Sequence, residues 1–526
     1  MEKRTWLAVL LMCGIWFGYV QFFSPIPPPK AAAPVAAASA EKTDGKNEIS
    51  GATLPADSIF TSPPSSEGMN YSTAKMEVSF SKLGGKIQQL TLKNYKKSVA
   101  KDAPPIELID TNTAYATAVL FSNPELSDLS KAEYLLETKG STVAAETNLK
   151  GVLFQKTFSF SDTENLIETE YKLKFPTDKK DWGYLLMPLG MKEVHFDRND
   201  PMASWEIVGY QSEKVTRHNI DSVKAEDQIL QGPTGWLAFG NKYFATAIVT
   251  LSDINPDIVF TKKQNFTGAY LRYPLALKEG QKEITFKTKI YAGPKDIKTF
   301  SQFPGMKRLV DYGTFEFFAN ALLAILKFFY GLVHNYGVAI ILLTILVRVL
   351  FYPLSVKSMK SMKAMQKLQP QIAALKVKYK DDMKKQNEEQ MALFKANKVN
   401  PAGGCLPMLL QLPVFIALYA VLGNSIELFQ APFFGWIKDL SVKDPYYVYP
   451  VLMGLAMLWQ QKLTPAVGMD PMQQKMMYFM PLIFTFMMIN LPSGLTMYIF
   501  VSTLLGIVQQ ISMRDPKNIT AIATTK

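Results

Sequence analysis

The pattern of apolar and polar positions divides the chain into two unlike parts. Between residues 59 and 305, apolar and polar residues alternate in short runs, and small or polar residues separate neighbouring runs at Gly84-Gly85, at 162–165 and at Gly240-Asn241. Alternation of this kind is typical of half-buried strands, and glycine or asparagine between two such runs indicates a hairpin. We therefore expect a large antiparallel β-sandwich domain over 59–305.

The second part begins after Gly337, where apolar runs are long enough to form helices that cross a membrane. A hydrocarbon core of about 30 Å needs roughly 20 helical residues. Together with an apolar run at 6–23, the pattern predicts a polytopic α-helical membrane protein with six spans, five of them in a core over 338–512. The five expected core spans are 338–356, 405–424, 447–462, 477–491 and 494–511.

The first 58 residues predict a membrane anchor and a linker. Lys3 and Arg4 precede 18 mostly apolar residues, and a stretch rich in proline and alanine follows. We expect an N-terminal transmembrane anchor over 1–23, with its N-terminus in the cytoplasm, and a flexible linker over 24–58. A cleaved signal peptide is the alternative, although the apolar run is longer than the usual 7 to 15 residues of a signal core.

Residues 313–335 form an apolar segment with a narrow polar stripe. Glu316, Asn320, Lys327 and His334 fall within about 40° of one another on a helix at 100° per residue. One polar stripe on an apolar helix favours a helix that lies on the membrane surface. Because the span at 338–356 already connects the outer domain to the inner loop, a second crossing here would reverse that loop. We therefore expect an interfacial amphipathic helix.

The segment 357–400 is predicted to be a cytoplasmic helical hairpin. It contains eleven lysines and only four acidic residues, which is typical of a loop on the cytoplasmic side and explains much of the net charge of +12 without nucleic acid. Met359, Met362 and Met365 recur every three residues before Pro370, which opens or kinks an arm. The hairpin is either simply solvated or an adaptable surface that receives varied partners. After the core, 513–526 is expected to be a short cytoplasmic tail.

The loop after the span at 405–424 carries aromatic residues. Trp436 follows a pair of phenylalanines in "APFFGWIKDL". Tryptophan is enriched at membrane–water interfaces. We therefore expect Trp436 to be an interface anchor on the outer side of the membrane.

Several kinds of enzyme chemistry lack the necessary residues. The two cysteines and three histidines are scattered, and the sequence contains no HExxH, no GxSxG and no phosphate-binding GxxxxGK[ST] loop. The sequence therefore predicts no metal, no cofactor and no catalytic residues. We expect a protein that is not an enzyme.

Arg348 is the unusual residue of the core. It is the only ionisable residue away from the ends of the five core spans, and no Asp or Glu lies within them. An arginine at mid-span costs about 2.5 to 3.5 kcal/mol on insertion scales, so a lipid-facing position is disfavoured. Thr344, Gln411 and Ser502 are polar residues within the same spans. Arg348 either makes a hydrogen-bonded packing contact or carries an uncompensated positive charge in a wet cavity.

Four segments resemble a known family. "TILVRVLFYPLSVKSMKSMKAMQKLQP", "NPAGGCLPMLLQLPVFIALY", "LTPAVGMDPMQQKMMYFMP" and "LPSGLTMYIFVSTLLGIVQQ" are similar to signature segments of the YidC/Oxa1/Alb3 membrane protein insertases. The long first span and the β domain resemble the Gram-negative form of YidC. The resemblance implies an inner-membrane insertase and chaperone whose large domain is periplasmic and whose two termini are cytoplasmic.

The resemblance also implies roles for individual residues. Arg348 matches the family's groove arginine, which takes the hydrophilic segment of an incoming protein while the apolar helix slides into lipid. Thr344, Gln411 and Tyr498 correspond to polar groove positions. Ile499 stands where some members have a second tyrosine.

The expected partners are nascent inner-membrane proteins, membrane lipids and the Sec translocon. Ribosome binding is expected to be weak, because the tail is short and carries few basic residues. The alternative function is a secondary transporter that uses Arg348 to bind an organic anion. An envelope enzyme with its site in the β domain is a third hypothesis, without candidate residues.

Overall fold

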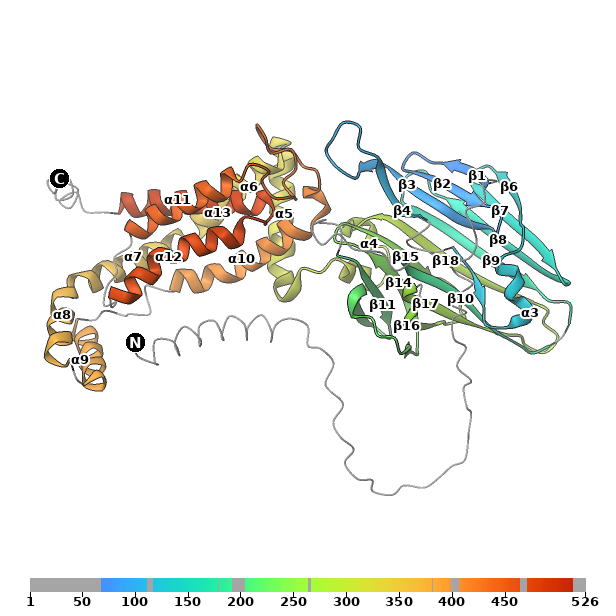
Figure 1. The fold of residues 1–526 in the computed structure, drawn as a ribbon, viewed down its shortest axis with the longest axis horizontal. Coiled ribbons are helices and arrows are strands. Elements are labelled where there is room, and N and C mark those ends of the chain that lie inside the picture. The colour runs from blue at the N-terminus through green and yellow to red at the C-terminus, as the bar shows by residue number, and fades with distance from the viewer. Residues whose placement is uncertain are drawn as a thin grey trace, which may run out of the picture.

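The computed structural model describes residues 68–110, 117–177, 179–191, 204–263, 266–380, 382–397, 399, 406–463 and 471–513. The expected anchor at 1–23, the linker at 24–58 and the tail beyond Met513 lie outside the described residues. A β-rich part and a helical part lie end to end, with α8 and α9 at the end of the helical part far from the strands (Figure 1).

The largest sheet of the β-rich part has nine strands, and each pair of neighbours is antiparallel. In spatial order, the strands are β12 (Lys214–Asn219), β11 (Glu206–Gln211), β14 (Thr234–Gly240), β15 (Phe244–Thr250), β18 (Glu283–Pro294), β9 (Leu166–Lys174), β8 (Val152–Phe160), β7 (Thr142–Leu149) and β6 (Leu135–Lys139).

Two smaller antiparallel sheets complete the domain, with two short helices, α3 (Pro124–Ser127) and α4 (Ile297–Phe300). The five-stranded sheet runs β13 (Gln228–Leu230), β16 (Asp257–Lys263), β17 (Phe266–Ala276), β10 (Asp181–Met191) and β5 (Leu120–Phe121). The four-stranded sheet runs β1 (Gly68–Ser72), β2 (Met76–Ser81), β3 (Lys86–Lys96) and β4 (Pro105–Ile109).

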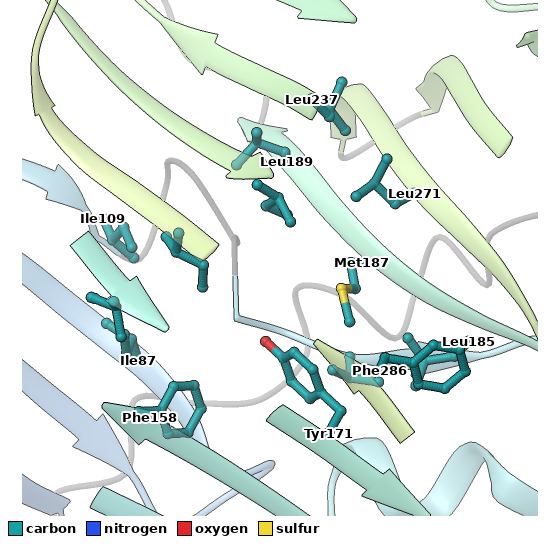
Figure 2. Packing of buried hydrophobic residues seen from close by; sticks show 14 of the residues in the cluster. Ile87, Ile109, Phe158, Tyr171, Leu185, Met187, Leu189, Leu237, Leu271 and Phe286 are labelled. Carbon is teal, nitrogen blue, oxygen red and sulfur yellow. The ribbon is translucent and has the colours of Figure 1, made fainter. Parts of the chain in front are cut away.

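The core of the domain lies where side chains from all three sheets meet. Figure 2 shows Phe286 of the nine-stranded sheet near Met187 of the five-stranded sheet, and Phe158 of the nine-stranded sheet near Ile87 of the four-stranded sheet. All four side chains are almost fully buried. The predicted antiparallel β-sandwich is therefore confirmed.

The predicted hairpins are confirmed as well. β2 and β3 pair across Gly84 and Gly85, whose φ angles of 76° and 52° suit glycine. β8 pairs with β9 across 161–165, and β14 pairs with β15 across 241–243. Alternation identified β8 because one of its faces packs against the core, whereas β14 and β15 are buried on both faces.

The helical part contains nine described helices: α5 (Glu316–Val333), α6 (Tyr336–Leu350), α7 (Tyr352–Lys367), α8 (Gln369–Lys378), α9 (Met383–Ala396), α10 (Leu406–Asn424), α11 (Val448–Leu463), α12 (Pro471–Met488) and α13 (Ser493–Ser512). α10, α11, α12 and α13 run alongside one another, and α5 lies crosswise to them, next to the β-rich part (Figure 1). α6 begins at an Asn335 cap, whose side chain accepts a hydrogen bond from the Val338 amide at 3.1 Å.

The structure differs from the expected continuous span at 338–356. α6 ends at Leu350, and α7 leaves it at a bend of 58°. Pro353 lies in the first turn of α7, where its missing N–H is not needed, so the new helix starts there and runs on to Lys367. The predicted hairpin begins at 357, so its first residues, up to Lys367, are part of α7.

The rest of the hairpin is the pair α8 and α9. Pro370 lies in the first turn of α8, as its predicted role in opening an arm requires, and Asp382 caps α9 by accepting from the Lys385 amide at 3.0 Å. Leu368, Ile372 and Phe394 form a small buried cluster between the arms. The hairpin therefore has a core of its own.

By length and composition, α5 and α13 could each cross a membrane, and the bent pair α6 and α7 could form one broken span. In α10 and α12, the side chains are described only over Gln411–Asn424 and Lys475–Met488. Over these residues the two helices are apolar but shorter. The described residues therefore give two or three candidate spans where the sequence predicts five in this region.

The loop after α10 joins the helical part to the β domain. The Phe429 ring lies 5.0 Å from the Tyr243 ring and 5.3 Å from the Phe244 ring, measured between centroids. The Gln430 side chain donates to the Lys96 carbonyl at 2.7 Å. A buried apolar cluster also continues from the β domain into the helices. These contacts fix the loop against the sandwich.

Candidate functional site

The side chain of Arg348 is held by one residue of α13. Its Nε donates to the Ser502 hydroxyl at 3.1 Å, and one terminal nitrogen donates to the Ser502 carbonyl at 2.5 Å and to the hydroxyl at 2.9 Å. Hydrogen bonds from a charged donor contribute about 1.5 to 3 kcal/mol each, which offsets part of the cost of removing the guanidinium from water. Ser502 is uncharged, so no carboxylate among the described residues compensates the positive charge.

A glycine one turn along α13 makes room for this arrangement. A Cβ atom at Gly506 would lie 3.4 Å from a guanidinium nitrogen of Arg348 and 2.8 Å from the amide nitrogen of Gln460. A side chain that extends beyond Cβ would therefore compete for the space that these two groups occupy. Gly506 allows α6, α11 and α13 to bring polar groups together.

Arg348 lines a partly open groove of about 620 Å³ between α6, α7, α10, α11, α12 and α13. The groove combines polar side chains with large apolar ones and contains no carboxylate among its lining residues. The lining residues are Arg348, Ser355, Ser358, Met359, Met362, Gln411, Leu412, Phe415, Met457, Gln460, Phe484, Tyr498, Ile499, Ser502, Thr503, Gly506, Gln509 and Gln510.

Several polar atoms in the groove have no conventional partner among the described residues. The Gln509 amide nitrogen and the Gln510 amide oxygen are buried without a hydrogen bond. The Tyr498 hydroxyl lies near Gln411 and Ser502 but makes no hydrogen bond of normal geometry. Beside Arg348, a cavity of about 20 Å³ is large enough for one water molecule. Buried polar groups of this kind favour water or a polar guest.

The groove is closed toward the β domain. At that end, Ile340 of α6, Leu418 of α10 and Leu495 of α13 are almost fully buried in one apolar cluster. The loop between α10 and α11 folds over α13, where the Gly494 amide donates to the Leu440 carbonyl at 3.0 Å. Met359 and Met362 of α7 also line the groove.

The residues that the sequence singles out do not all meet in the groove. Arg348, Gln411, Tyr498 and Ser502 line it together, as do Met359 and Met362. Thr344 is buried, and its hydroxyl donates to the Ile340 carbonyl of its own helix at 2.6 Å. It is therefore not a lining residue.

Two further predicted residues lie outside the groove. Met365 packs against the core of the hairpin. Trp436 lies in the loop after α10, where its indole N–H donates to the Asp444 carboxylate at 3.0 Å. The indole is therefore tied to the loop at the closed end of the bundle.

Sequence reasoning did not assign Gly506, Phe415 or Phe484 to the site, although all three line the groove. A glycine inside an otherwise apolar helix is a signal of close approach, which would have pointed to Gly506. Phe415 and Phe484 carry no such signal, because an aromatic residue in an apolar helix is equally suited to lipid or to a packed core.

The comparisons with known proteins cover most of the chain. The family model described as the YidC periplasmic domain matches residues 69–325, and the model described as the 60Kd inner membrane protein matches residues 328–520.

Relatives match the chain over nearly its full length. The membrane protein insertase YidC of Syntrophus aciditrophicus (strain SB) is 36% identical over 97% of this chain and 99% of its own. The membrane protein insertase YidC of Geobacter metallireducens is 35% identical over 97% of this chain and 98% of its own. A solved structure of an active YidC insertase is 21% identical, with a TM-score of 0.38, and covers 86% of this chain and 93% of its own.

Proposed function

The chain belongs to the YidC family of membrane protein insertases, and we propose that its Arg348 groove receives the polar segment of each client protein. As a member of this family, it is an inner-membrane insertase with a periplasmic β domain, it acts on nascent membrane proteins, and it is not an enzyme.

The proposed topology has six spans, with both termini in the cytoplasm. α6, α10, α11, α12 and α13 are five of them, and the apolar run at 6–23 is the sixth. α5 lies on the periplasmic surface of the membrane. Its crosswise direction in Figure 1 and its polar stripe support this placement, and Lys327 of that stripe forms an ion pair with Glu427 at 2.5 Å. The groove then opens toward the cytoplasm, because its closed end faces the periplasmic domain.

In this mechanism, electrostatics brings the polar segment partway into the membrane. Each acidic side chain at mid-span costs about 2.5 to 3.5 kcal/mol in lipid. Arg348 offers such a side chain an opposite charge and donors inside a groove that excludes bulk lipid. The single observation that carries this proposal is a guanidinium bound only to the neutral Ser502 among the described residues.

The apolar helix of the client drives the process to completion. Twenty apolar residues at about −0.3 to −0.6 kcal/mol each contribute roughly −6 to −12 kcal/mol. Leu412, Phe415 and Phe484 provide an apolar wall beside Arg348 along which this helix slides. No nucleotide is needed, because the free energy comes from transfer into lipid.

We assign the first contact with the client to the hairpin. Met359 and Met362 line the groove, and methionine adapts to apolar surfaces of many shapes. Met365 packs against the hairpin core, so we propose that it sets the angle at which the hairpin meets the client. Thr344 supports α6 one turn before Arg348, and Trp436 fixes the outer loop at the membrane surface.

The remaining partners belong to the proposal. Lipids contact the exposed face of α12, where Phe479, Ile483 and Phe486 are solvent-exposed in the isolated chain. The Sec translocon passes on larger clients, and ribosomes bind weakly. The transporter alternative requires saturable uptake of an organic anion, which the same liposomes would reveal.

Reconstituted insertion tests the proposal. Liposomes with the wild-type protein should insert a single-span client with an acidic tail better than empty liposomes. Arg348→Ala should reduce this about tenfold, corresponding to about 1.4 kcal/mol, whereas Arg348→Lys should retain much of it. A client with a neutral tail is the matched control and should lose little. Equal insertion of both clients by all three proteins would refute the electrostatic role of Arg348.

A further inference from the structure

A second cavity lies at the junction between the β domain and the helical bundle. Its volume is about 310 Å³, and it is partly open to solvent. Tyr95 of β3, Tyr291 of β18, Asp296 at the start of α4 and Glu427 in the loop after α10 line it, together with Lys75. It lies apart from the Arg348 groove, since the two share no lining residue.

The cavity has an acidic pole formed by two carboxylates. Asp296 accepts hydrogen bonds from the Lys298 and Thr299 amides at 3.1 Å and from the Thr299 hydroxyl at 2.8 Å. Burial alone would raise the pKa of Asp296, but these hydrogen bonds outweigh it, and the pKa lies below its usual value. The group is therefore ionised at neutral pH and has acceptor capacity left.

Both tyrosines stay protonated beside these carboxylates. Burial, and then the charges of Asp296 and Glu427, raise the pKa of Tyr95, and burial and Asp296 raise the pKa of Tyr291. An aromatic ring next to carboxylates is a favourable surface for an ammonium group.

Two lysines also belong to the surroundings of this cavity. The Lys75 ammonium group makes no ion pair within the described residues, although it lines the same cavity. Lys327 lies beside the cavity, paired with Glu427 at 2.5 Å. The site thus offers a cation and an anion within one small space, which is complementary to a zwitterion.

The position of α5 gives the depth of the cavity in the membrane. Phe317, Phe328 and Leu332 are 81%, 63% and 64% exposed, and their spacing places them within about 60° on one helix face. This apolar stripe is suited to the acyl region below a membrane surface. Lys327 is displaced by about 80° from Phe317 around the helix, which places it toward the headgroup level. It forms an ion pair with Glu427, which lines the cavity.

We propose that this cavity binds the headgroup of a zwitterionic phospholipid with a primary amine, as in phosphatidylethanolamine. The ammonium group binds at Asp296 and Glu427 over the Tyr95 ring, and the phosphate binds at Lys75. A primary ammonium donates three hydrogen bonds, which a quaternary choline group cannot do, so the carboxylates distinguish the two. The placement at the headgroup level rests on the proposed position of α5.

Lipid retention by the full-length protein tests this site. The protein is reconstituted with equal amounts of phosphatidylethanolamine, phosphatidylcholine and phosphatidylglycerol, and the retained lipid is identified by native mass spectrometry. We expect at least fivefold enrichment of phosphatidylethanolamine. Glu427→Gln should abolish it by removing charge, and Asn94→Trp should abolish it by filling the cavity from an exposed position on its wall.

The control is Glu107→Gln. Glu107 is a carboxylate on β4, the neighbour of β3 in the four-stranded sheet, and it does not line the cavity. It should retain the enrichment. Equal retention of the three lipids by the wild type, or unchanged enrichment in both cavity variants, would overturn the proposal. Binding of soluble glycerophosphoethanolamine without enrichment of the lipid would also overturn it, because the ligand would then be a free amine. Insertion of an acidic-tailed client, measured on the same samples, reports separately on the Arg348 groove.

Discussion

Substitution of Gly506 separates the stability of the bundle from its function. The Cβ of an alanine would meet the far end of the Gln460 side chain at 2.8 Å and Arg348 at 3.4 Å. Because Gln460 is flexible at that end, it can move by a few tenths of an ångström. Alanine also favours a helix interior over glycine by about 0.5 to 1 kcal/mol. Gly506→Ala should therefore be as stable as the wild type and should retain most insertion.

Gly506→Leu should still fold but should be defective in insertion. A leucine side chain on a helix leans back toward the preceding turn, where Arg348 binds Ser502. Carbon atoms need about 3.5 to 4 Å of separation, so the guanidinium must retreat by about 2 to 3 Å. At an effective dielectric constant of about 20, attraction to a client carboxylate falls from about 4 kcal/mol at 4 Å to about 2.5 kcal/mol at 6.5 Å. Insertion of an acidic-tailed client should then fall about tenfold.

The assay is insertion of acidic-tailed and neutral-tailed clients into liposomes, combined with thermal unfolding of each variant. Gly331→Leu on α5 is the matched control, because a Cβ there has no heavy atom within 4 Å. It should leave both readouts unchanged. Full insertion by Gly506→Leu at normal stability would refute the requirement for a correctly placed guanidinium.

Two further changes test the β domain and its junction. Burial, and then the charge of Lys86, lower the pKa of Lys156 to about 7. The unfolded chain therefore binds one more proton between pH 7 and 10.5, and stability should rise with pH by up to about 1.4 kcal/mol per unit. Lys156→Met should lack this rise in urea unfolding at pH 7.5 and 9.5, and equal slopes would contradict the assignment. Phe429→Ala should remove ring contacts with Tyr243 and Phe244. The free energy that holds the loop against the β domain should fall by about 2 to 3 kcal/mol. Spin-label distances between the β domain and the bundle should broaden without earlier unfolding of the sandwich, and unchanged distances would show that the loop does not hold the domain.

The strands of the β domain could be predicted because periodicity and turn residues agree. Gly84-Gly85 follows β2, whose alternation matches its observed burial. Gly240-Asn241 marks the turn between β14 and β15, which are buried along nearly their whole length, so the turn residues identify that hairpin better than alternation does. The division into three sheets could not be predicted. It depends on pairing between strands far apart in the sequence, such as β9 with β18, and no local pattern specifies that pairing.

For the groove, the sequence identified the charge but not the whole site. Arg348 and Ser502 stood out because polar groups are costly in lipid. Thr344 stood out for the same reason, yet its hydroxyl bonds to its own helix, which satisfies it without a groove. Apolar lining residues such as Phe484 depend on which way each helix faces, and tertiary packing decides that.

Photo-crosslinking from the groove tests the central claim most directly. A crosslinking residue at Gln411 leaves Arg348 intact, and the same residue at Phe486, which is 77% exposed on α12, is the control. The account predicts that a stalled client forms adducts through its polar segment at position 411, and that Phe486 captures only the apolar helix or lipid. Adducts of the polar segment at 486 with none at 411 would contradict it.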